Sequence, residues 1–416
     1  MERLIITGGA RLKGSVTISG AKNAILPILA SCLLSDTPLV LEGVPRLDDV
    51  VTMQEVLQSL GAKVKWLDDV MEIDPSNITS TEVPASLMRR MRASNLVMGA
   101  LLGRLGNVRA SYPGGCTIGS RPMDLHLKGF GYLGAKVHEH HGFIEMEAAK
   151  LTGTEIHLDF PSVGATENIM MAAVLAEGTT TIRNAAREPE IVDLQNFLNR
   201  LGAEIRGAGL DIIQINGVSR VGREIAYRVI PDRIETGTFM VAAAITRGEI
   251  EIINTIPEHV EPVTAKLREA GIRVWEEDDR IIVKGVDTWN ALDIRTLPYP
   301  GFPTDMQPQF MVFLSLAQGT SIITENIFEN RFQHVGELRR MGAHIRVEGR
   351  SAVISGVPNL TGALVEATDL RAGAALVLGG LAAENTTIVE GVEHINRGYE
   401  KLDAKLRRLG AQIRRE

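Results

Sequence analysis

Cysteine is scarce in this sequence, where Cys32 and Cys116 are the only two among 416 residues. Two thiols are too few for a disulfide framework or a cysteine-based zinc site, so we expect a reducing compartment. A basic segment followed by an apolar one is missing at the start, and the chain has no uncharged apolar run of about 18 residues. These absences indicate a cytoplasmic protein without a membrane partner.

Aromatic residues and an excess of basic charge are also lacking. Phe, Trp and Tyr make up 4% of the chain, and 51 acidic residues against 44 basic ones give a net charge of −7. Few rings can therefore stack on nucleobases, and the basic surface typical of a nucleic-acid-binding protein is missing. We expect no nucleic-acid partner.

What the sequence does contain is the composition of a globular protein, with 44% hydrophobic and 23% charged residues. Its length exceeds what one hydrophobic core usually supports, which favours two domains. A motif of the form Leu-x-x-Leu/Met-Gly-Ala, or a close relative of it, also recurs six times. Its glycines are Gly61, Gly134, Gly202, Gly271, Gly342 and Gly410. Their spacing of 68 to 73 residues predicts six copies of one small unit.

Each unit is expected to contain two helices and several short strands. In the third unit, segments of helical periodicity alternate with β-branched segments, and a glycine is expected to end each helix. The helices are expected at residues 169–175 and 191–201, and the strands at residues 179–182, 203–205 and 212–215. This pattern predicts the α/β class, with units of the βαβαββ type.

The two ends of the chain complement each other. The sixth unit lacks its closing strands, whereas the first residues contain surplus strand sequence that resembles the end of the fifth unit. We therefore expect the N-terminus to complete the last unit, which divides the units as three plus three. The resulting domains are residues 22–229, which carry the Cys116 loop, and residues 1–21 plus 230–416, with a cleft between the domains for small molecules.

The first helix of every unit is predicted to begin at an equivalent place, 14 residues before a recurring turn. The expected starts are Lys22, Arg92, Gly164, Ile234 beside Arg233, Asp305 and Arg371. A base at a helix start costs a little stability unless an anion lies opposite, because the helix dipole is already positive there. The bases in this set are either simply solvated or form a site for a polyanionic small molecule.

The segment YPGGCTIGSRP at residues 112–122 is expected to be an exposed loop, because glycines and prolines surround its cysteine. Arg121 would favour the thiolate of Cys116 and would also bind an anionic substrate. An inert surface thiol is the alternative. Cys32 lies in the apolar segment AILPILASCLL and is expected to be buried.

Ten segments resemble motifs of the UDP-N-acetylglucosamine 1-carboxyvinyltransferase family, in the family's order and spacing. They are GAKNA (20–24), MRAS (91–94), PGGCTIGSRP (113–122), SVGAT (162–166), AAREPEIVD (185–193), PDRIETGTF (231–239), FPTDMQ (302–307), FENRF (328–332), ATDLRA (367–372) and RGYE (397–400). The resemblance covers almost the whole chain. It implies the inside-out α/β barrel of the enolpyruvyl transferases, consistent with two domains of three units each.

The resemblance implies transfer of the enolpyruvyl group of phosphoenolpyruvate to the 3-hydroxyl of UDP-N-acetylglucosamine, with release of phosphate. This reaction is the first committed step of peptidoglycan synthesis, so it serves cell wall biogenesis, cell shape and cell division. It proceeds by addition and elimination through a tetrahedral ketal, which requires anchors for anionic groups, an acid and a base. The two substrates are the implied partners, and no cofactor, metal or obligate protein partner is implied.

Matching the family's motifs residue by residue assigns roles to single side chains. Cys116 matches the proton donor, which forms a covalent phosphothioketal adduct with phosphoenolpyruvate and is alkylated by fosfomycin. Asp305 matches the residue that contacts the sugar hydroxyl and acts as base, and a helix cap is its alternative. Lys22, Asn23, Arg121 and Arg397 match the phosphoenolpyruvate site, and Lys22 and Arg397 also count as catalytic. The residues that match the UDP-N-acetylglucosamine site are Arg92, Arg121, Pro122, Met123, Asp124, Leu125, Ser162, Val163, Gly164, Asp305, Ile327, Arg331, Asp369 and Arg371.

Three other functions are alternatives to this one. The sister enzyme 3-phosphoshikimate 1-carboxyvinyltransferase shares the fold and phosphoenolpyruvate, but the PGGCTIGSRP and FENRF segments favour the nucleotide-sugar enzyme. A non-catalytic regulatory paralogue that binds a UDP-sugar would not need Lys22, Cys116, Asp305 and Arg397 together. An RNA-end-processing protein is disfavoured by the acidic charge and the few aromatic residues.

Two patterns suggest a metal or nucleotide-phosphate site only superficially. Residues 138–141 read His-Glu-His-His, but they precede a turn and a further strand, so a solvated hairpin is favoured over a metal site. The glycine-rich loops lack the Gly-Lys-Ser/Thr sequence of a Walker A motif. We expect neither a metal nor a cofactor.

Overall fold

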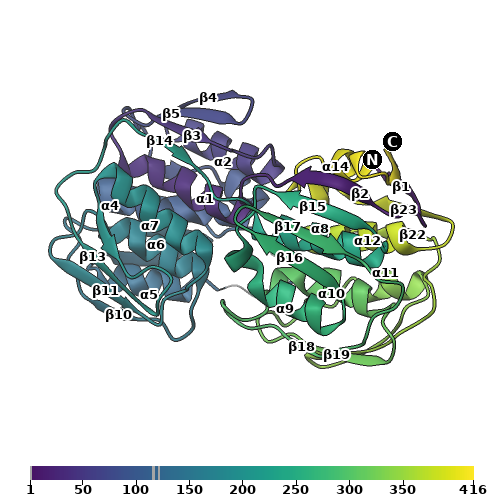
Figure 1. Ribbon diagram of the computed structural model, residues 1–416. Helices are drawn as coiled ribbons and strands as arrows, with labels where there is room; N and C mark the ends of the chain where they lie inside the picture. Colours follow the sequence, from purple (N-terminus) through teal and green to yellow (C-terminus); the bar gives the residue numbers. More distant parts are fainter. Residues whose placement is uncertain (1, 115–117, 120–121) are drawn as a thin grey trace. The chain divides into compact units, whose positions relative to one another are not determined.

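Each sequence repeat corresponds to one four-stranded sheet. The computed structural model describes residues 2–114, 118–119 and 122–416. By its internal contacts the chain divides into two units, which we treat separately (Figure 1). The N-terminal unit comprises residues 20–114 and 122–230, and the C-terminal unit comprises residues 2–19, 118–119 and 231–416. The predicted α/β class with six repeated units is confirmed.

The N-terminal unit contains the first three repeats. Its helices are α1 (Lys22–Ser31), α2 (Asp48–Ser59), α3 (Ala85–Arg90), α4 (Val97–Leu105), α5 (Asp124–Tyr132), α6 (Val163–Ala173) and α7 (Pro189–Leu201), with short 3-10 helices η1 (Cys32–Leu34) and η2 (Arg92–Leu96). Its strands are β3 (Leu39–Glu42), β4 (Lys63–Leu67), β5 (Val70–Asp74), β6 (Glu82–Val83), β7 (Asn107–Ser111), β8 (Lys136–His140), β9 (Phe143–Glu147), β10 (Glu155–His157), β11 (Thr179–Arg183), β12 (Glu204–Arg206), β13 (Ile212–Asn216) and β14 (Ala226–Arg228).

Each sheet of this unit takes one strand from another repeat. The strand orders are β14-β3-β5-β4, β6-β7-β9-β8 and β10-β11-β13-β12. The first strand of each order lies parallel to its neighbour, and the remaining pairs are antiparallel. Because β14 of the third repeat pairs with β3 of the first, the three repeats close on themselves.

The C-terminal unit contains the other three repeats. Its helices are α8 (Arg233–Ile245), α9 (Glu261–Glu269), α10 (Gln307–Leu314), α11 (Val335–Arg340), α12 (Leu370–Ala382), α13 (Val392–Asn396) and α14 (Leu402–Arg408), with η3 (Pro257–Val260) and η4 (Thr304–Met306). Its strands are β1 (Leu4–Thr7), β2 (Lys13–Thr17), β15 (Glu249–Ile253), β16 (Arg273–Glu277), β17 (Arg280–Lys284), β18 (Ile294–Arg295), β19 (Thr320–Thr324), β20 (His344–Glu348), β21 (Ser351–Ser355), β22 (Leu364–Glu366), β23 (Thr386–Glu390) and β24 (Gln412–Arg415).

The N-terminal segment completes this unit. The strand orders are β16-β17-β15-β2, β18-β19-β21-β20 and β22-β23-β1-β24. Strand β1 lies antiparallel between β23 and β24, so the N-terminal segment supplies one strand of the sheet of the last repeat. Strand β2 then continues into the fourth repeat, where it lies parallel to β15. It closes the ring of repeats in the same way as β14 closes the N-terminal unit.

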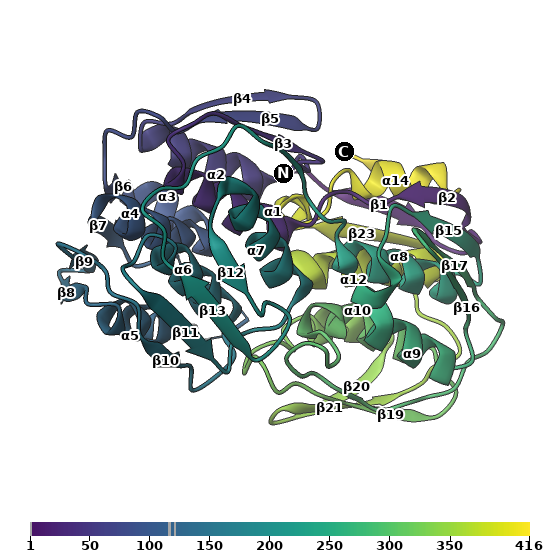
Figure 2. The same ribbon diagram turned by 60° about the vertical axis from the view of Figure 1, so that its left-hand side comes forward.

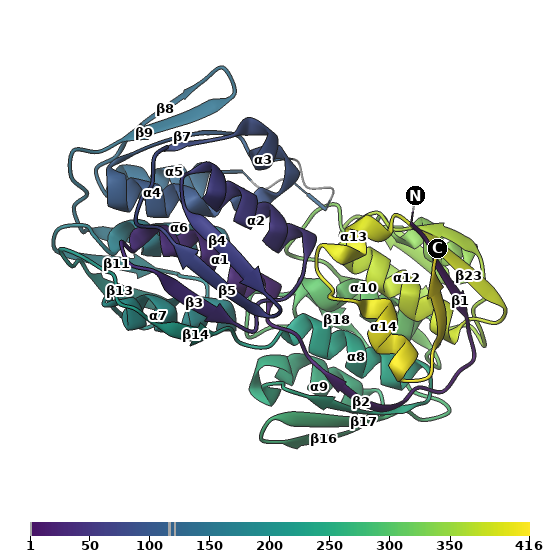
Figure 3. The same ribbon diagram turned by 90° about the horizontal axis from the view of Figure 1, so that it is seen from above.

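Three helices form the centre of each unit, and the sheets lie outside them (Figures 2 and 3). In the C-terminal unit, α8, α10 and α12 contact one another and bury nearly all of their residues. Helices α1, α4 and α6 take the same place in the N-terminal unit. A helix that is buried on all sides needs mostly apolar side chains on every face, which explains the apolar runs at the centre of each repeat. This is the inside-out barrel expected from the sequence.

The six predicted helix starts are confirmed to within one residue. The observed starts are those of α1, η2, α6, α8, η4 and α12. One helix end differs from the prediction, because α6 stops at Ala173 and Gly178 lies in the turn that follows, with φ +87°. Helix α7 does end at Gly202, which adopts φ +108°. In the described part of the chain, none of these helices has both the length and the apolar character needed to cross a membrane.

Candidate active site

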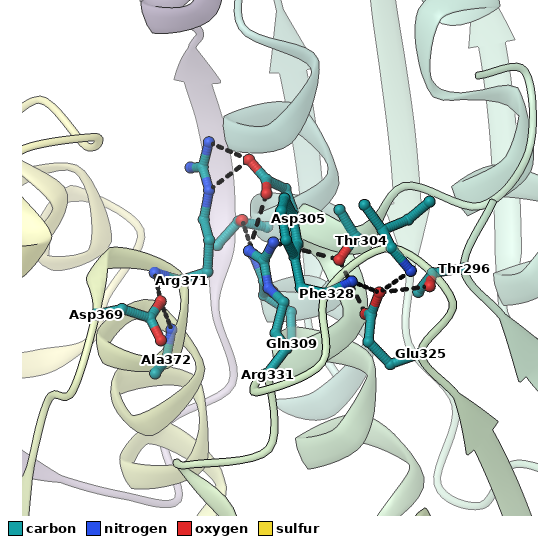
Figure 4. Close-up of polar contacts among 12 residues, drawn as sticks. Thr296, Thr304, Asp305, Gln309, Glu325, Phe328, Arg331, Asp369, Arg371 and Ala372 are labelled. Atoms are coloured by element: carbon teal, nitrogen blue, oxygen red, sulfur yellow. Dashed lines mark hydrogen bonds and ion pairs between the residues drawn. The ribbon is translucent and has the colours of Figure 1, made fainter. Parts of the chain in front are cut away.

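Asp305 lies at the centre of a polar cluster in the C-terminal unit (Figure 4). Its Oδ1 accepts a hydrogen bond from Nη2 of Arg331 at 2.8 Å, and its Oδ2 lies 3.1 Å from Nε and 3.0 Å from Nη2 of Arg371. Both arginines are buried, with 3% and 2% of their surface exposed. Asp305 comes from η4, Arg331 from the segment after β19 and Arg371 from the start of α12. The fold thus brings together three residues that were predicted for the UDP-N-acetylglucosamine site.

The two arginines determine the charge of Asp305. Burial alone would raise the pKa of this carboxyl, but the positive charges of Arg371 and Arg331 outweigh burial and hold the pKa far below its ordinary value. Burial would likewise lower the pKa of Arg371, whereas Asp305 raises it. Asp305 is therefore ionised, and it is a weak base for as long as both arginines bind it.

Asp369 caps helix α12. Its Oδ1 accepts hydrogen bonds from the backbone N–H groups of Arg371 at 2.8 Å and Ala372 at 3.0 Å (Figure 4). An N-cap carboxylate satisfies backbone donors that have no partner within the helix. In the structure, Asp369 therefore stabilises the helix start that carries Arg371. Its contact with a nucleotide sugar stays a prediction.

The ring of Tyr399 packs against Arg371, the second arginine of this cluster. The guanidinium carbon of Arg371 is 5.2 Å from the centroid of the Tyr399 ring. The Tyr399 hydroxyl lies 3.0 Å from Oγ1 of Thr238 and 3.1 Å from Nε2 of Gln309, which are buried side chains on α8 and α10. Helices α8 and α10, two of the three central helices, therefore hold the Tyr399 ring in contact with the Arg371 guanidinium.

Arg397, predicted for the phosphoenolpyruvate site, directly follows α13 in the same unit and is half-buried.

Ile327 lies in a turn that is held by a residue not singled out from the sequence. Glu325 follows β19 and accepts hydrogen bonds at Oε1 from the backbone N–H groups of Ile327 at 2.8 Å and Phe328 at 3.1 Å. Only 1% of the surface of Glu325 is exposed. In the sequence, Glu325 is an acidic residue directly after a strand of β-branched residues. An exposed strand end has the same pattern, so the sequence did not indicate that Glu325 is buried.

In the N-terminal unit, Lys22 has a carboxylate partner. Its Nζ lies 2.6 Å from Oδ2 of Asp49, and both side chains are buried. Lys22 begins α1, and Asp49 lies in the first turn of α2. Because the helix dipole is positive at a helix start, a base there is stabilised by an anion opposite it, and Asp49 supplies one. Asn23 is half-buried beside Lys22.

A buried histidine lies close to two other predicted residues of this unit. His126 on α5 lies with Nδ1 3.0 Å from Nδ2 of Asn168, which can only donate, so Nδ1 accepts the hydrogen bond. Burial, with the positive charge of Arg92, lowers the pKa of His126 to about 3, which keeps the ring neutral. A Cβ on Gly164 would lie 3.2 Å from Cε1 of the ring. Arg92 and the start of α6 therefore both lie near His126, a residue that was not predicted from the sequence.

The remaining predicted residues of the N-terminal unit surround the starts of α5 and α6. Ser162 is the N-cap of α6, where its side chain accepts a hydrogen bond from the backbone N–H of Ala165 at 3.3 Å, and Val163 begins the helix. Pro122 and Asp124 are exposed, Leu125 is half-buried, and Met123 is buried with its sulfur 3.1 Å from Nδ2 of Asn95. The predictions for Cys116 and Arg121 lie outside the described residues.

The predicted burial of Cys32 and the predicted hairpin after residue 135 are both observed. Cys32 is fully buried, and burial raises the pKa of its thiol far above the ordinary value, which disfavours the reactive thiolate. Residues 136–140 and 143–147 form the predicted hairpin, β8 and β9, with exposed histidines. Across residues 2–114, 118–119 and 122–416, no group of three or more His, Cys, Asp or Glu side chains is arranged to hold a metal ion.

Comparisons with known proteins agree with this architecture. A family model described as EPSP synthase (3-phosphoshikimate 1-carboxyvinyltransferase) matches residues 6–406. The enolpyruvyl transferase NikO from Streptomyces tendae has a similar structure, with a TM-score of 0.90 and 26% identity over 100% of this chain and 98% of its own. An EPSP synthase from Acinetobacter baumannii has a TM-score of 0.79 at 18% identity over 100% of both chains, which shows the shared fold.

Curated relatives are more similar in sequence. Two proteins of Carboxydothermus hydrogenoformans, UDP-N-acetylglucosamine 1-carboxyvinyltransferases 1 and 2, are 57% and 58% identical to this chain over its full length, and the matches cover 98% and 99% of theirs. The UDP-N-acetylglucosamine 1-carboxyvinyltransferase of Halothermothrix orenii is 52% identical over 100% of both chains. The chain therefore belongs to the enolpyruvyl transferase family and, within it, to the UDP-N-acetylglucosamine 1-carboxyvinyltransferases.

Proposed function

We propose that this chain transfers the enolpyruvyl group of phosphoenolpyruvate to the 3-hydroxyl of UDP-N-acetylglucosamine and releases phosphate. The observation that carries the proposal is the full-length identity of 52% to 58% with relatives named for this transfer. Buried basic side chains at helix starts in both units support it, because both substrates are anionic. The role in peptidoglycan synthesis and the cytoplasmic location belong to the same proposal.

The reaction needs one base, one acid and positive charge near the leaving group. In the addition, the sugar hydroxyl loses its proton, its oxygen bonds to C2 of phosphoenolpyruvate and C3 gains a proton, which yields a tetrahedral ketal. In the elimination, C3 loses a proton and the bond from C2 to the phosphate oxygen breaks, so the double bond forms again. Positive side chains stabilise the negative charge that collects on the phosphate as it leaves.

We assign the base to Asp305 and the acid to Cys116. Because Arg331 and Arg371 lower the pKa of Asp305, the carboxylate takes up a proton poorly while both pairs are intact. Anionic groups of the substrates compete for the same guanidinium groups, and loosening either pair raises the pKa of Asp305 towards the value that a base needs. The carboxylate and phosphate of phosphoenolpyruvate are assigned to Lys22, Asn23, Arg121 and Arg397. The nucleotide sugar is assigned to Arg92, Ser162 and Ile327, to residues 121–125 and 163–164, and to the cluster of Asp305, Arg331, Asp369 and Arg371.

A phosphate-release assay tests the proposal. The purified chain is given phosphoenolpyruvate and UDP-N-acetylglucosamine, each is omitted in turn, and 3-phosphoshikimate replaces the nucleotide sugar in a parallel reaction. We expect release only when phosphoenolpyruvate and UDP-N-acetylglucosamine are both present. Release with 3-phosphoshikimate would assign the sister reaction instead. No release with either acceptor, while UDP-N-acetylglucosamine still binds, would indicate a regulatory protein.

A further inference from the structure

Glu325 connects three separate segments of the C-terminal unit (Figure 4). Its Oε1 accepts hydrogen bonds from Oγ1 of Thr296 at 2.7 Å and from the backbone N–H groups of Ile327 and Phe328. Its Oε2 accepts a hydrogen bond from Oγ1 of Thr304 at 2.9 Å. Thr296 follows β18, Thr304 begins η4, and residues 327–328 form the turn after β19. One buried carboxylate thus holds the residue before Asp305 and the turn of Ile327 together.

All four of these donors are uncharged. Burying a carboxylate is costly unless its lone pairs are satisfied, and two hydroxyls with two backbone N–H groups do this here. A neutral side chain of the same shape could not accept all four hydrogen bonds, because an amide nitrogen is a donor only. The arrangement therefore depends on the carboxylate itself.

The other repeats show that the fold alone does not require an acid at this place. The residue directly after the central strand is Gly43, Asn184, Asn254 or Gly391 in four other repeats, each with φ between +53° and +72°. Glu325 does not adopt a positive φ.

In two of these repeats the asparagine side chain supports the neighbouring strand end. Asn184 donates to the carbonyl of Leu158 at 2.7 Å, and Asn254 donates to the carbonyl of Ile18 at 2.7 Å. In the fifth repeat the next residue, Asn326, makes the corresponding bond to the carbonyl of Thr296 at 3.1 Å. Because Asn326 makes this local hydrogen bond, the side chain of Glu325 is available to bind segments that are distant in the sequence.

The contact with Thr304 sets the direction of a chain of hydrogen bonds that ends at Asp305. A threonine hydroxyl has one proton, and Thr304 donates it to Glu325. The Thr304 oxygen is then left to accept from Nη1 of Arg331, which lies 3.2 Å away. The Nη2 of the same guanidinium binds Oδ1 of Asp305 at 2.8 Å. Glu325 therefore fixes the orientation of the arginine that binds the carboxylate.

We propose that Glu325 is a positioning residue for enolpyruvyl transfer. It acts on Asp305 through Thr304 and Arg331, and on the nucleotide sugar through the turn of Ile327. In this way the carboxylate base and the acceptor hydroxyl are held at the relative position that proton transfer needs. The proposal rests on the function proposed above. Glu325→Gln keeps the shape of the side chain but places an amide N–H against Thr304, which reverses the hydrogen bond there and loosens the pair of Arg331 with Asp305.

The test compares the Glu325→Gln variant with the wild type in the phosphate-release assay. We expect kcat/KM for UDP-N-acetylglucosamine to fall roughly 10- to 100-fold, as the loss of a hydrogen bond to a charged group implies, and KM for phosphoenolpyruvate to change less than about twofold. A looser Arg331 pair raises the pKa of Asp305, so the acidic limb of the pH profile of kcat/KM should move to higher pH. A purely structural role would not move this limb.

Two further variants separate a positioning role of Glu325 from a general loss of stability. Asn254→Gly removes a side-chain bond at the same place of another repeat and tolerates the positive φ, so it should lower the melting temperature without moving the pH profile. Thr304→Val interrupts the chain at its middle, and its effect should not add to that of Glu325→Gln in the double variant.

The failures of this proposal and of the proposed function are distinguishable. An active wild type whose Glu325→Gln variant keeps its kcat/KM and pH profile would overturn the role of Glu325 and leave the function intact. The role would equally be overturned if the variant lost activity only in proportion to its melting temperature, as Asn254→Gly would. A wild type that releases no phosphate would overturn the function and, with it, this role.

Discussion

Two bases that begin central helices, Lys22 and Arg371, bind carboxylates from other parts of the sequence. Lys22 binds Asp49 on another helix, and Arg371 binds Asp305, which is 66 residues away. The helix dipole explains why an anion is needed there, but it does not say which residue supplies it. These carboxylates hold the cations in place and, under the roles proposed above for Lys22 and Arg371, would compete with an anionic substrate for them.

At the residue scale, His126 should make stability depend on pH. Its pKa is about 3 in the folded chain, whereas an unfolded histidine has a pKa of about 6.5. Between these values the unfolded chain binds a proton that the folded chain does not, so stability falls as the pH drops below about 6.5. At pH 5 the loss relative to pH 7.5 should be about 2 kcal/mol.

The variant His126→Gln lacks this titration. Between pH 7.5 and pH 5 its free energy of unfolding, measured by urea denaturation, should therefore fall by about 2 kcal/mol less than that of the wild type. The exposed His138 provides the control for replacing a histidine, since His138→Gln on the surface should change the free energy of unfolding by less than about 0.5 kcal/mol. Equal pH dependence in His126→Gln and the wild type would contradict the assignment of a buried neutral ring.

At the scale of elements, α4 and α6 approach each other so closely that a side chain is excluded. The N–H of Gly99 donates to Oδ1 of Asn168 at 2.8 Å, and a Cβ on Gly99 would lie 2.3 Å from the backbone oxygen of Asn168. The helices would have to separate to admit a methyl group. Gly99→Ala should therefore lower the free energy of unfolding by about 1–3 kcal/mol in chemical denaturation.

A second glycine provides the matched control for this packing argument. Gly131 lies on the exposed side of α5, and a Cβ there would meet no atom within 4 Å. Gly131→Ala should stabilise the chain by about 0.5–1 kcal/mol, because alanine favours a helix and restricts the unfolded chain. If both substitutions had the same effect, close approach of α4 to α6 would not be what Gly99 provides.

The elements themselves followed well from the sequence, because their signals are local. The repeat placed all six starts of the central helices, and Gly202 ended α7 where a left-handed residue was expected. The prediction for the end of α6 was wrong, since a helix buried on all sides can end at Ala173 without a glycine. Glu325 and His126 were missed because their importance lies in contacts with residues that are remote along the chain.

At the scale of the whole molecule, the closure of the last repeat by β1 should be visible in stability. Ile6 is fully buried in β1, where it faces Thr387 of β23 and Ile413 of β24. Ile6→Ala should cost about 2–5 kcal/mol in chemical denaturation, because it leaves a cavity in the core of the C-terminal unit. Amide exchange should accelerate in β23 and β24.

The neighbouring Ile5 provides the control for this strand. Ile5 points to the other face of the sheet and is half-buried, so Ile5→Ala should cost clearly less. If the two substitutions had equal effects, or if amide exchange changed in the N-terminal unit rather than in β23 and β24, β1 would not be an integral strand of the last repeat.

The sequence by itself determined the repeated unit, the α/β class, the starts of the central helices and the family, because periodicity, turn residues and short motifs are local properties of a chain. Only the tertiary structure decided that Asp49 binds Lys22, that Asp305 lies between Arg331 and Arg371, and that Glu325 joins Thr304 to the turn of Ile327. These pairs join separate repeats or separate segments of one repeat, and their hydrogen bonds and charges act only when the chain has folded. The physical reason is distance, since a contact between residues far apart in sequence leaves no periodic or local signal.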